Sequence, residues 1–124
     1  MLLVRSYRSG MEITLGMSGE IPVFFLSGRL DAITSPLLEE RLKPLLEDSL
    51  GSRHLIFEGS SLSYVSSAGL RVFLMAQRQL ATRNGRLAFA ALTHQVLDLF
   101  HLAGLQDLFV IKESVDAAAT GLAS

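Results

Sequence analysis

Residues 57–70 pass from an apolar run, through a stretch of small hydroxyl side chains, directly into a helical pattern. This junction constrains the fold because a buried strand must end close to the point where a helix begins. It places Ser66 and Ser67 in the opening turn of that helix, where backbone N–H groups lack intrahelical partners. A serine there can cap the helix or carry a phosphate, and the residues alone leave both possibilities open.

The rest of the chain alternates strand and helix. The expected strands are 12–17, 21–26, 54–57, 87–92 and 108–111, with residues 1–10 as a further edge strand or a loose tail. The expected helices begin at Thr34-Ser35-Pro36, Ser66-Ser67, Thr93 and Ser114, with a kink or early stop at Pro44 and a left-handed stop at Asn84-Gly85. Residues 117–124 are expected to form a flexible tail. This order predicts a single-domain α/β fold over 1–124, a mixed sheet of four to five strands with helices packed against it.

Composition excludes several classes of function. The 124 residues are 49% apolar, which suits one compact domain, and the net charge of −1 argues against nucleic-acid binding. Neither a signal-peptide pattern nor a membrane-length apolar run is present, so we expect a cytoplasmic protein without membrane insertion. The chain has no cysteine, and His54, His94 and His101 form no ligand pattern, so neither a metal nor a cofactor is expected.

Three polar segments are expected to meet where the parallel strands end. Asp31 follows an early strand, Glu58 follows the central strand, and Ser66-Ser67 open the helix. Two carboxylates and a hydroxyl could form a catalytic cluster, but no histidine or lysine pattern completes an acyl-transfer site. The sequence also lacks the G-x-S-x-G elbow and a glycine-rich phosphate loop. We therefore do not expect an enzyme.

Two segments carry a family resemblance. Gly28-Arg29-Leu30-Asp31 and Ser66-Ser67-Ala68-Gly69-Leu70 resemble the sulfate transporter and anti-sigma antagonist (STAS) domain, and within it the stand-alone anti-sigma-factor antagonists of bacteria. The helix-opening motif of that family is an acidic residue, then serine or threonine, a small residue, glycine and leucine. Residues 67–70 match its last four positions.

The resemblance implies partner switching. The unmodified antagonist would bind an anti-sigma factor that is itself a serine-protein kinase; phosphorylation would release it, and a PP2C-type phosphatase would reset it. Ser67 is the implied phospho-acceptor, Asp31 matches the acidic residue beside it, and Glu58 matches an aspartate that ends the central strand. The expected partner-binding residues are Asp31, Glu58, Ser66, Ser67, Ala68, Gly69 and Arg71.

Two departures and two alternatives accompany this reading. Ser66 replaces the acidic residue before the phospho-acceptor, so Ser66 is a second candidate for the phosphate, and Glu58-Gly59 replaces aspartate-leucine. The main alternative is a non-switching scaffold or subunit that docks on an ATPase, in a lipid-transport complex or a stress-signalling assembly. Nucleotide binding by Asp31 and Ser67 is a third possibility, against which the missing phosphate loop argues.

Overall fold

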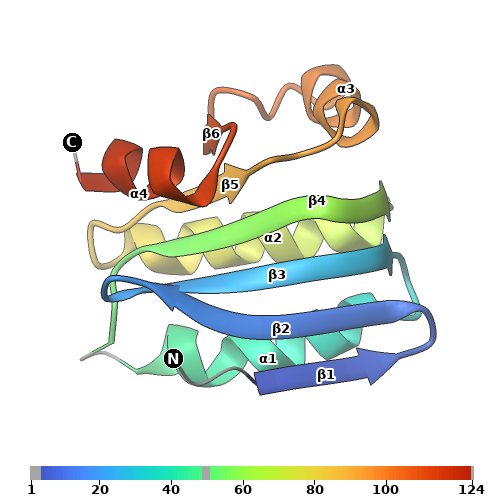
Figure 1. Ribbon diagram of the computed structural model, residues 1–124, viewed down its shortest axis with the longest axis horizontal. Helices are drawn as coiled ribbons and strands as arrows, with labels where there is room; N and C mark the ends of the chain where they lie inside the picture. The colour runs from blue at the N-terminus through green and yellow to red at the C-terminus, as the bar shows by residue number, and fades with distance from the viewer. Residues whose placement is uncertain (1–3, 49–50, 124) are drawn as a thin grey trace.

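The computed structural model describes residues 4–48 and 51–123, which form one mixed sheet with helices on both of its faces (Figure 1). The strands are β1 (Val4–Arg8), β2 (Met11–Ser18), β3 (Ile21–Leu30), β4 (Leu55–Val65), β5 (Leu87–Ala90) and β6 (Val110–Lys112). The helices are α1 (Ser35–Glu47), α2 (Ser67–Ala81), α3 (His94–Leu102) and α4 (Val115–Ala123). The α/β class is confirmed, and the sheet has six strands where four to five were expected.

The strands lie in the sheet in the order in which they occur in the chain. β1, β2 and β3 are antiparallel neighbours, and β3, β4, β5 and β6 pair in parallel. Val4–Arg8 therefore forms the edge strand that was one of the two readings of residues 1–10. Because β3 and β4 are parallel, their carboxyl ends lie at one edge of the sheet, and α1 and α2 both begin there (Figure 1).

The main core lies between the sheet and the helices α1, α2 and α3. At its centre, phenylalanines from strands and helices pack together: the ring centroids of Phe57 and Phe73 are 5.1 Å apart, and those of Phe73 and Phe89 are 4.8 Å apart, edge to face. All three rings are fully buried. Burial of large rings at these spacings contributes several kcal/mol per side chain, since truncation of a core phenylalanine costs about 3–5 kcal/mol. This core fixes α2 against β4 and β5.

The opposite face of the sheet holds a smaller core beneath α4. Ala118 and Leu122 of α4 are buried against Val23, Ile56 and Ala88. The flexible tail expected for 117–124 is therefore wrong up to Ala123, since these residues continue the helix; Ser124 lies outside the described residues. The helix start expected at Ser114 is close to the observed one, but its C-terminal part was missed because alanine supplies little hydrophobic contrast along it.

The central strand differs most from the expectation. β4 was expected to end at Phe57, but it continues to Val65, and after Glu58 it pairs only with β3. Glycine and serine there suggested a turn. The strand survives because Leu62 and Val65 are buried in the main core, while register shifts at 25–27 and 28–29 of β3 absorb the irregular pairing.

Helix α1 tolerates its internal proline. Pro44 lies inside the helix, which continues for three more residues to Glu47. Of the kink or early stop expected at Pro44, the early stop therefore does not occur. The C-terminal carbonyls of α1 receive a partner from outside: the Arg83 guanidinium donates to the carbonyl oxygens of Asp48 at 2.5 Å and Leu45 at 2.9 Å. A cation at the negative end of the helix dipole stabilises that end.

Candidate functional site

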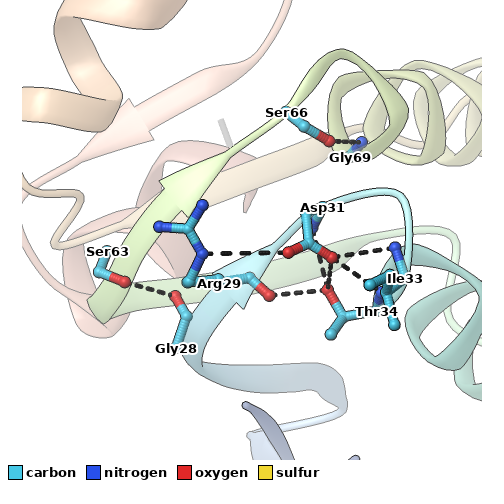
Figure 2. A network of polar contacts seen from close by, with 8 residues as sticks. All are labelled: Gly28, Arg29, Asp31, Ile33, Thr34, Ser63, Ser66 and Gly69. Carbon is cyan, nitrogen blue, oxygen red and sulfur yellow. Dashed lines mark hydrogen bonds and ion pairs between the residues drawn. The ribbon is translucent and has the colours of Figure 1, made fainter. Parts of the chain in front are cut away.

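The opening of α2 assigns different roles to its two serines. Ser66 is the N-cap residue with extended backbone dihedrals, and its Oγ accepts a hydrogen bond from the Gly69 N–H at 3.3 Å (Figure 2). The Ser66 N–H donates to the carbonyl of Leu30 at 2.8 Å, which ties the end of β3 to the start of α2. Ser66 is half-buried, so the fold already uses its hydroxyl and its backbone.

Ser67 is the first residue of α2, and its side chain is exposed. Within residues 4–48 and 51–123, its hydroxyl makes no hydrogen bond. A side chain in the first turn that has no structural bond is open to a modifying enzyme, and the free N–H groups around it favour an anion.

Asp31 closes the turn between β3 and α1. Its Oδ1 accepts hydrogen bonds from the backbone N–H groups of Ile33 at 3.0 Å and Thr34 at 3.1 Å, and lies 3.2 Å from the Thr34 hydroxyl oxygen (Figure 2). These donors, the Thr34 N–H first, hold the pKa of Asp31 below its ordinary value of 3.8; burial opposes the shift, and the charge of Arg29 adds to it. Asp31 is therefore a fixed anion beside the opening of α2.

The Thr34 hydroxyl serves the turn before α1 rather than the helix itself. Thr34 occupies the N-cap position of α1 but makes no side-chain cap bond. Its Oγ1 instead lies 2.7 Å from the carbonyl of Arg29, to which it donates, and accepts the Asp31 N–H at 2.9 Å. The fully buried hydroxyl thus binds the end of β3 to the loop rather than capping the helix.

Arg29 lies between the turn that leads into α1 and the start of α2, and the sequence indicated no separate role for it. Its Nε is 3.9 Å from Asp31 Oδ2, and its guanidinium carbon is 4.2 Å from the centre of the Tyr64 ring. Together with Ser66, Ser67 and Gln95 of α3, these two side chains line a pocket. Since Tyr64 and α3 reach this place only through the tertiary fold, the sequence carried no signal for them.

Gly28 directs β3 into this arrangement. Its φ is +106°, and a Cβ built on it would lie 1.9 Å from the carbonyl oxygen of Gly10. Only glycine fits there, because any side chain would be strained and would also clash with the backbone of the turn between β1 and β2. The Gly28 carbonyl accepts a bond from the Ser63 hydroxyl at 3.0 Å (Figure 2). The backbone bend at Gly28 thus directs the segment with Arg29 and Asp31 towards the start of α2.

Glu58 does not join this cluster. It lies inside β4, paired with Phe25 and Ala90, and its carboxylate accepts bonds from the N–H and hydroxyl of Ser60, the N–H at 2.7 Å. It lies seven positions before Val65, the last residue of β4, and a regular strand of that length spans roughly 20 Å. The expectation that Glu58 meets the helix opening failed because β4 does not end at Phe57.

Residues 68–71 divide between packing and surface. Gly69 is buried, and a Cβ on it would lie 2.9 Å from Leu30 and 3.0 Å from Val65, so its lack of a side chain lets α2 approach the sheet. Ala68 is half-buried, and Arg71 is exposed; both line a groove between α1 and α2. The structure therefore brings Asp31, Ser66, Ser67 and Arg71 to one end of α2, with Gly69 beneath them.

Within 4–48 and 51–123, His, Cys, Asp and Glu side chains form no group of three that could hold a metal ion. His54 has a structural bond instead, since its Nδ1 accepts the Arg86 N–H at 3.0 Å. None of the helices in these ranges has the length and apolar character that crossing a bilayer requires.

Comparisons with known proteins identify the family of the chain. The STAS domain profile matches residues 12–118. BtrV of Bordetella bronchiseptica is 29% identical over 109 residues, covering 88% of this chain and 92% of BtrV. The anti-sigma-B factor antagonist of Staphylococcus aureus is 31% identical over 91 residues, covering 73% of this chain and 82% of that protein.

A solved structure has the same fold. The anti-sigma factor antagonist from Mycobacterium paratuberculosis superposes with a TM-score of 0.81 at 23% identity, covering 92% of this chain and 95% of the other. At that identity the likeness concerns the fold, whereas the profile match extends over most of the sequence. On that match, and on the identity with the Staphylococcus aureus protein, the chain belongs to the STAS domain family.

Proposed function

We propose that this chain is a cytoplasmic anti-sigma-factor antagonist that works by partner switching and has no catalytic activity of its own. In the unmodified form it binds an anti-sigma factor that is also a serine-protein kinase. The kinase phosphorylates Ser67 and thereby releases the chain, and a PP2C-type phosphatase restores the binding form. Membership of the STAS domain family and a relative named as an anti-sigma-B factor antagonist support the proposal.

One observation carries the choice of Ser67 over Ser66. Ser66 caps α2 through its hydroxyl and is half-buried, whereas Ser67 is exposed and makes no side-chain bond within the described part of the chain. A kinase needs a hydroxyl that can leave the surface and enter an active site. Phosphorylation of Ser66 would cost the helix its cap, which contributes about 1 kcal/mol.

The helix opening suits a charge switch. A phosphate on Ser67 would add nearly two negative charges next to free N–H groups and the positive end of the α2 dipole, so the fold should tolerate it. The same charge beside the fixed anion Asp31 would repel an acidic or apolar partner surface. Like charges desolvated at an interface cost several kcal/mol, or about a hundredfold or more in affinity.

The proposed partner surface is smaller than the one expected from the sequence. It comprises Asp31, Ser66, Ser67, Ala68 and Arg71 at one end of α2. Glu58 is left out because it lies within β4, and Gly69 contributes by letting α2 pack closely against Leu30 and Val65 rather than by touching a partner.

The test is phosphate transfer from a candidate anti-sigma-factor kinase with ATP, followed by mass mapping of the modified residue. The wild type and Ser66→Ala should be modified at position 67, and Ser67→Ala should show no incorporation. The buried Ser35, which occupies the same position in α1, should stay unmodified in every variant. Modification at Ser66 would overturn the assignment, and stable kinase binding without any modification would favour the non-switching scaffold.

A further inference from the structure

A groove runs between α1 and α2, which lie side by side on one face of the sheet (Figure 1). It begins at Ala68, directly after Ser67, and follows α2 towards its C-terminal half. Its lining includes, from α2 and then from α1, Arg71, Leu74, Met75, Arg78, Pro36 and Glu39.

The α2 side of this groove is a single helical stripe. Residues 67, 71, 74, 75 and 78 recur at intervals of three and four, so they lie on one face of the helix. Arg71 and Arg78 are two turns apart, about 10 Å along the axis. The half-buried Leu74 and Met75 lie between them, so apolar side chains separate the two cationic ones along the stripe.

Among the residues that the structure describes, Arg71 and Arg78 share with Arg41, Arg86 and Lys112 an exposed cationic side chain without an ion pair, but Arg71 and Arg78 are the two of these that line the groove. Arg8, Arg29 and Lys43 each lie within 4.0 Å of a carboxylate. In the described ranges, the guanidinium groups of Arg71 and Arg78 make neither an ion pair nor a hydrogen bond, although Glu39 lines the same groove. With a net charge of −1 on the whole chain, this stripe is a local positive feature and no part of a general basic surface.

We infer that this groove docks an amphipathic helix of the protein partner, with two carboxylates about two turns apart facing Arg71 and Arg78 and apolar side chains over Leu74 and Met75. The spacing and charge of the stripe match such a helix. The groove has two separate cations, an apolar centre and the carboxylate of Glu39 on the opposite side. This pattern fits an amphipathic acidic helix better than it fits the continuous phosphates of a nucleic acid or a lipid surface.

The inference rests on the proposed function and adds a mechanism to it. Ser67 and Arg71 are four residues apart, so their side chains are neighbours on the helix surface. A phosphate on Ser67 lies within reach of Arg71 and competes with the first carboxylate of the partner for that guanidinium. Phosphorylation then both repels the acidic helix and removes one of its two anchors, while Arg78 remains free.

The first experiment uses peptides as defined probes. The whole unphosphorylated chain is titrated with a helical peptide of about 16 residues that carries two glutamates seven positions apart with two leucines between them. The control peptide has lysines in place of the glutamates. We expect the amide resonances of residues 35–39 and 68–78 to shift with the glutamate peptide alone, and the binding to weaken as salt rises. Equal shifts with both peptides, or shifts elsewhere on the molecule, would overturn the inference.

The second experiment uses variants and the anti-sigma-factor kinase. Arg78→Glu lies about 16 Å along α2 from Ser67, so it tests the groove without touching the helix opening. We expect it to weaken binding of both the glutamate peptide and the kinase about tenfold, whereas Arg86→Glu, at the start of β5 and outside the groove, leaves both unchanged.

The outcomes separate the two proposals. A kinase that binds and modifies the wild type and Arg78→Glu equally well would overturn the groove but leave partner switching intact. A kinase that ignores the wild type, while the glutamate peptide still binds the groove and loses about tenfold with Arg78→Glu, would overturn partner switching alone. Arg78-dependent binding of duplex DNA or of anionic vesicles, or an Arg78-dependent dimer, would replace the acidic helix as the occupant and so overturn the inference.

Discussion

The helices α1 and α2 each begin with two consecutive hydroxyl residues, Thr34-Ser35 and Ser66-Ser67, at the edge of the sheet where β3 and β4 end. At α1 both side chains are buried: Thr34 is 0% exposed and Ser35 is 5% exposed. At α2 the first is half-buried and the second is exposed. Since the local sequence pattern is the same, the difference shows that burial by neighbouring elements decides whether such a pair serves the fold or is open to a partner.

The side-chain hydrogen bonds of Thr34-Ser35 and Ser66-Ser67 also differ between the two helix starts. The Thr34 hydroxyl connects the Arg29 carbonyl with the Asp31 N–H, and Ser35 Oγ is buried without a hydrogen-bond partner in the described ranges. At α2, the Ser66 hydroxyl accepts the Gly69 N–H, whereas the Ser67 hydroxyl makes no hydrogen bond within residues 4–48 and 51–123. Of the four residues, Ser67 is therefore the one whose side chain is exposed and makes no hydrogen bond in the described ranges, and the proposed phosphorylation rests on that difference.

The largest effect we expect is on binding. Ser67→Asp should weaken binding to the anti-sigma factor about a hundredfold, because a carboxylate at that position repels the partner as a phosphate would. Its melting temperature should stay close to that of the wild type, since an acidic residue in the first turn suits the helix dipole. Titration calorimetry and thermal unfolding measure the two quantities. A large fall in melting temperature with binding retained would contradict the proposed switch.

The next largest effect that we expect is on folding stability, at the buried hydroxyl pair Thr34-Ser35. Thr34→Val should lower the free energy of unfolding by about 2 kcal/mol, because it leaves the Arg29 carbonyl and the Asp31 N–H without their partner in a buried setting. Ser67→Ala is the matched control and should change it by less than about 0.5 kcal/mol. Denaturant unfolding of both variants makes the measurement. Equal losses of unfolding free energy in Thr34→Val and Ser67→Ala would contradict the distinction between the two helix starts.

A smaller effect separates the two serines of α2. Ser66→Ala should cost about 1 kcal/mol of unfolding free energy through loss of the bond from the Gly69 N–H. Replacement by aspartate, another good N-cap residue, should recover most of that loss. Denaturant titrations of Ser66→Ala and Ser66→Asp provide the comparison. A neutral Ser66→Ala would mean that the cap bond contributes nothing to the helix.

The smallest effect that we expect is a change in folding stability at acidic pH, through Asp31. The pKa of Asp31 is lower in the folded chain than its ordinary value of 3.8, so its carboxylate adds stability that is fully present above that value and is lost as pH falls through the lower folded pKa. The stability difference between wild type and Asp31→Asn should therefore be constant above about pH 5 and shrink below about pH 4. Urea unfolding at a series of pH values follows it. A difference that grew towards low pH would reverse the assigned sign.

The sequence by itself determined the order of strands and helices and most helix starts. Periodicity and local capping carry that information, as at Ser66 and at Thr93, whose Oγ1 accepts the Val96 N–H. Through the resemblance carried by residues 28–31 and 66–70, the sequence also indicated Ser67 as the phospho-acceptor, whereas the backbone bend at Gly28 is visible only in the structure.

The tertiary structure alone decided where those elements meet. Exposure is a property of what packs against a residue, so no local pattern could tell buried Ser35 from exposed Ser67. The same holds for β4, whose turn-like residues stay in a strand because Leu62 and Val65 reach the core, and which thereby keeps Glu58 away from α2. The groove with Arg71 and Arg78 exists only because α1 and α2, distant along the chain, pack side by side on the sheet.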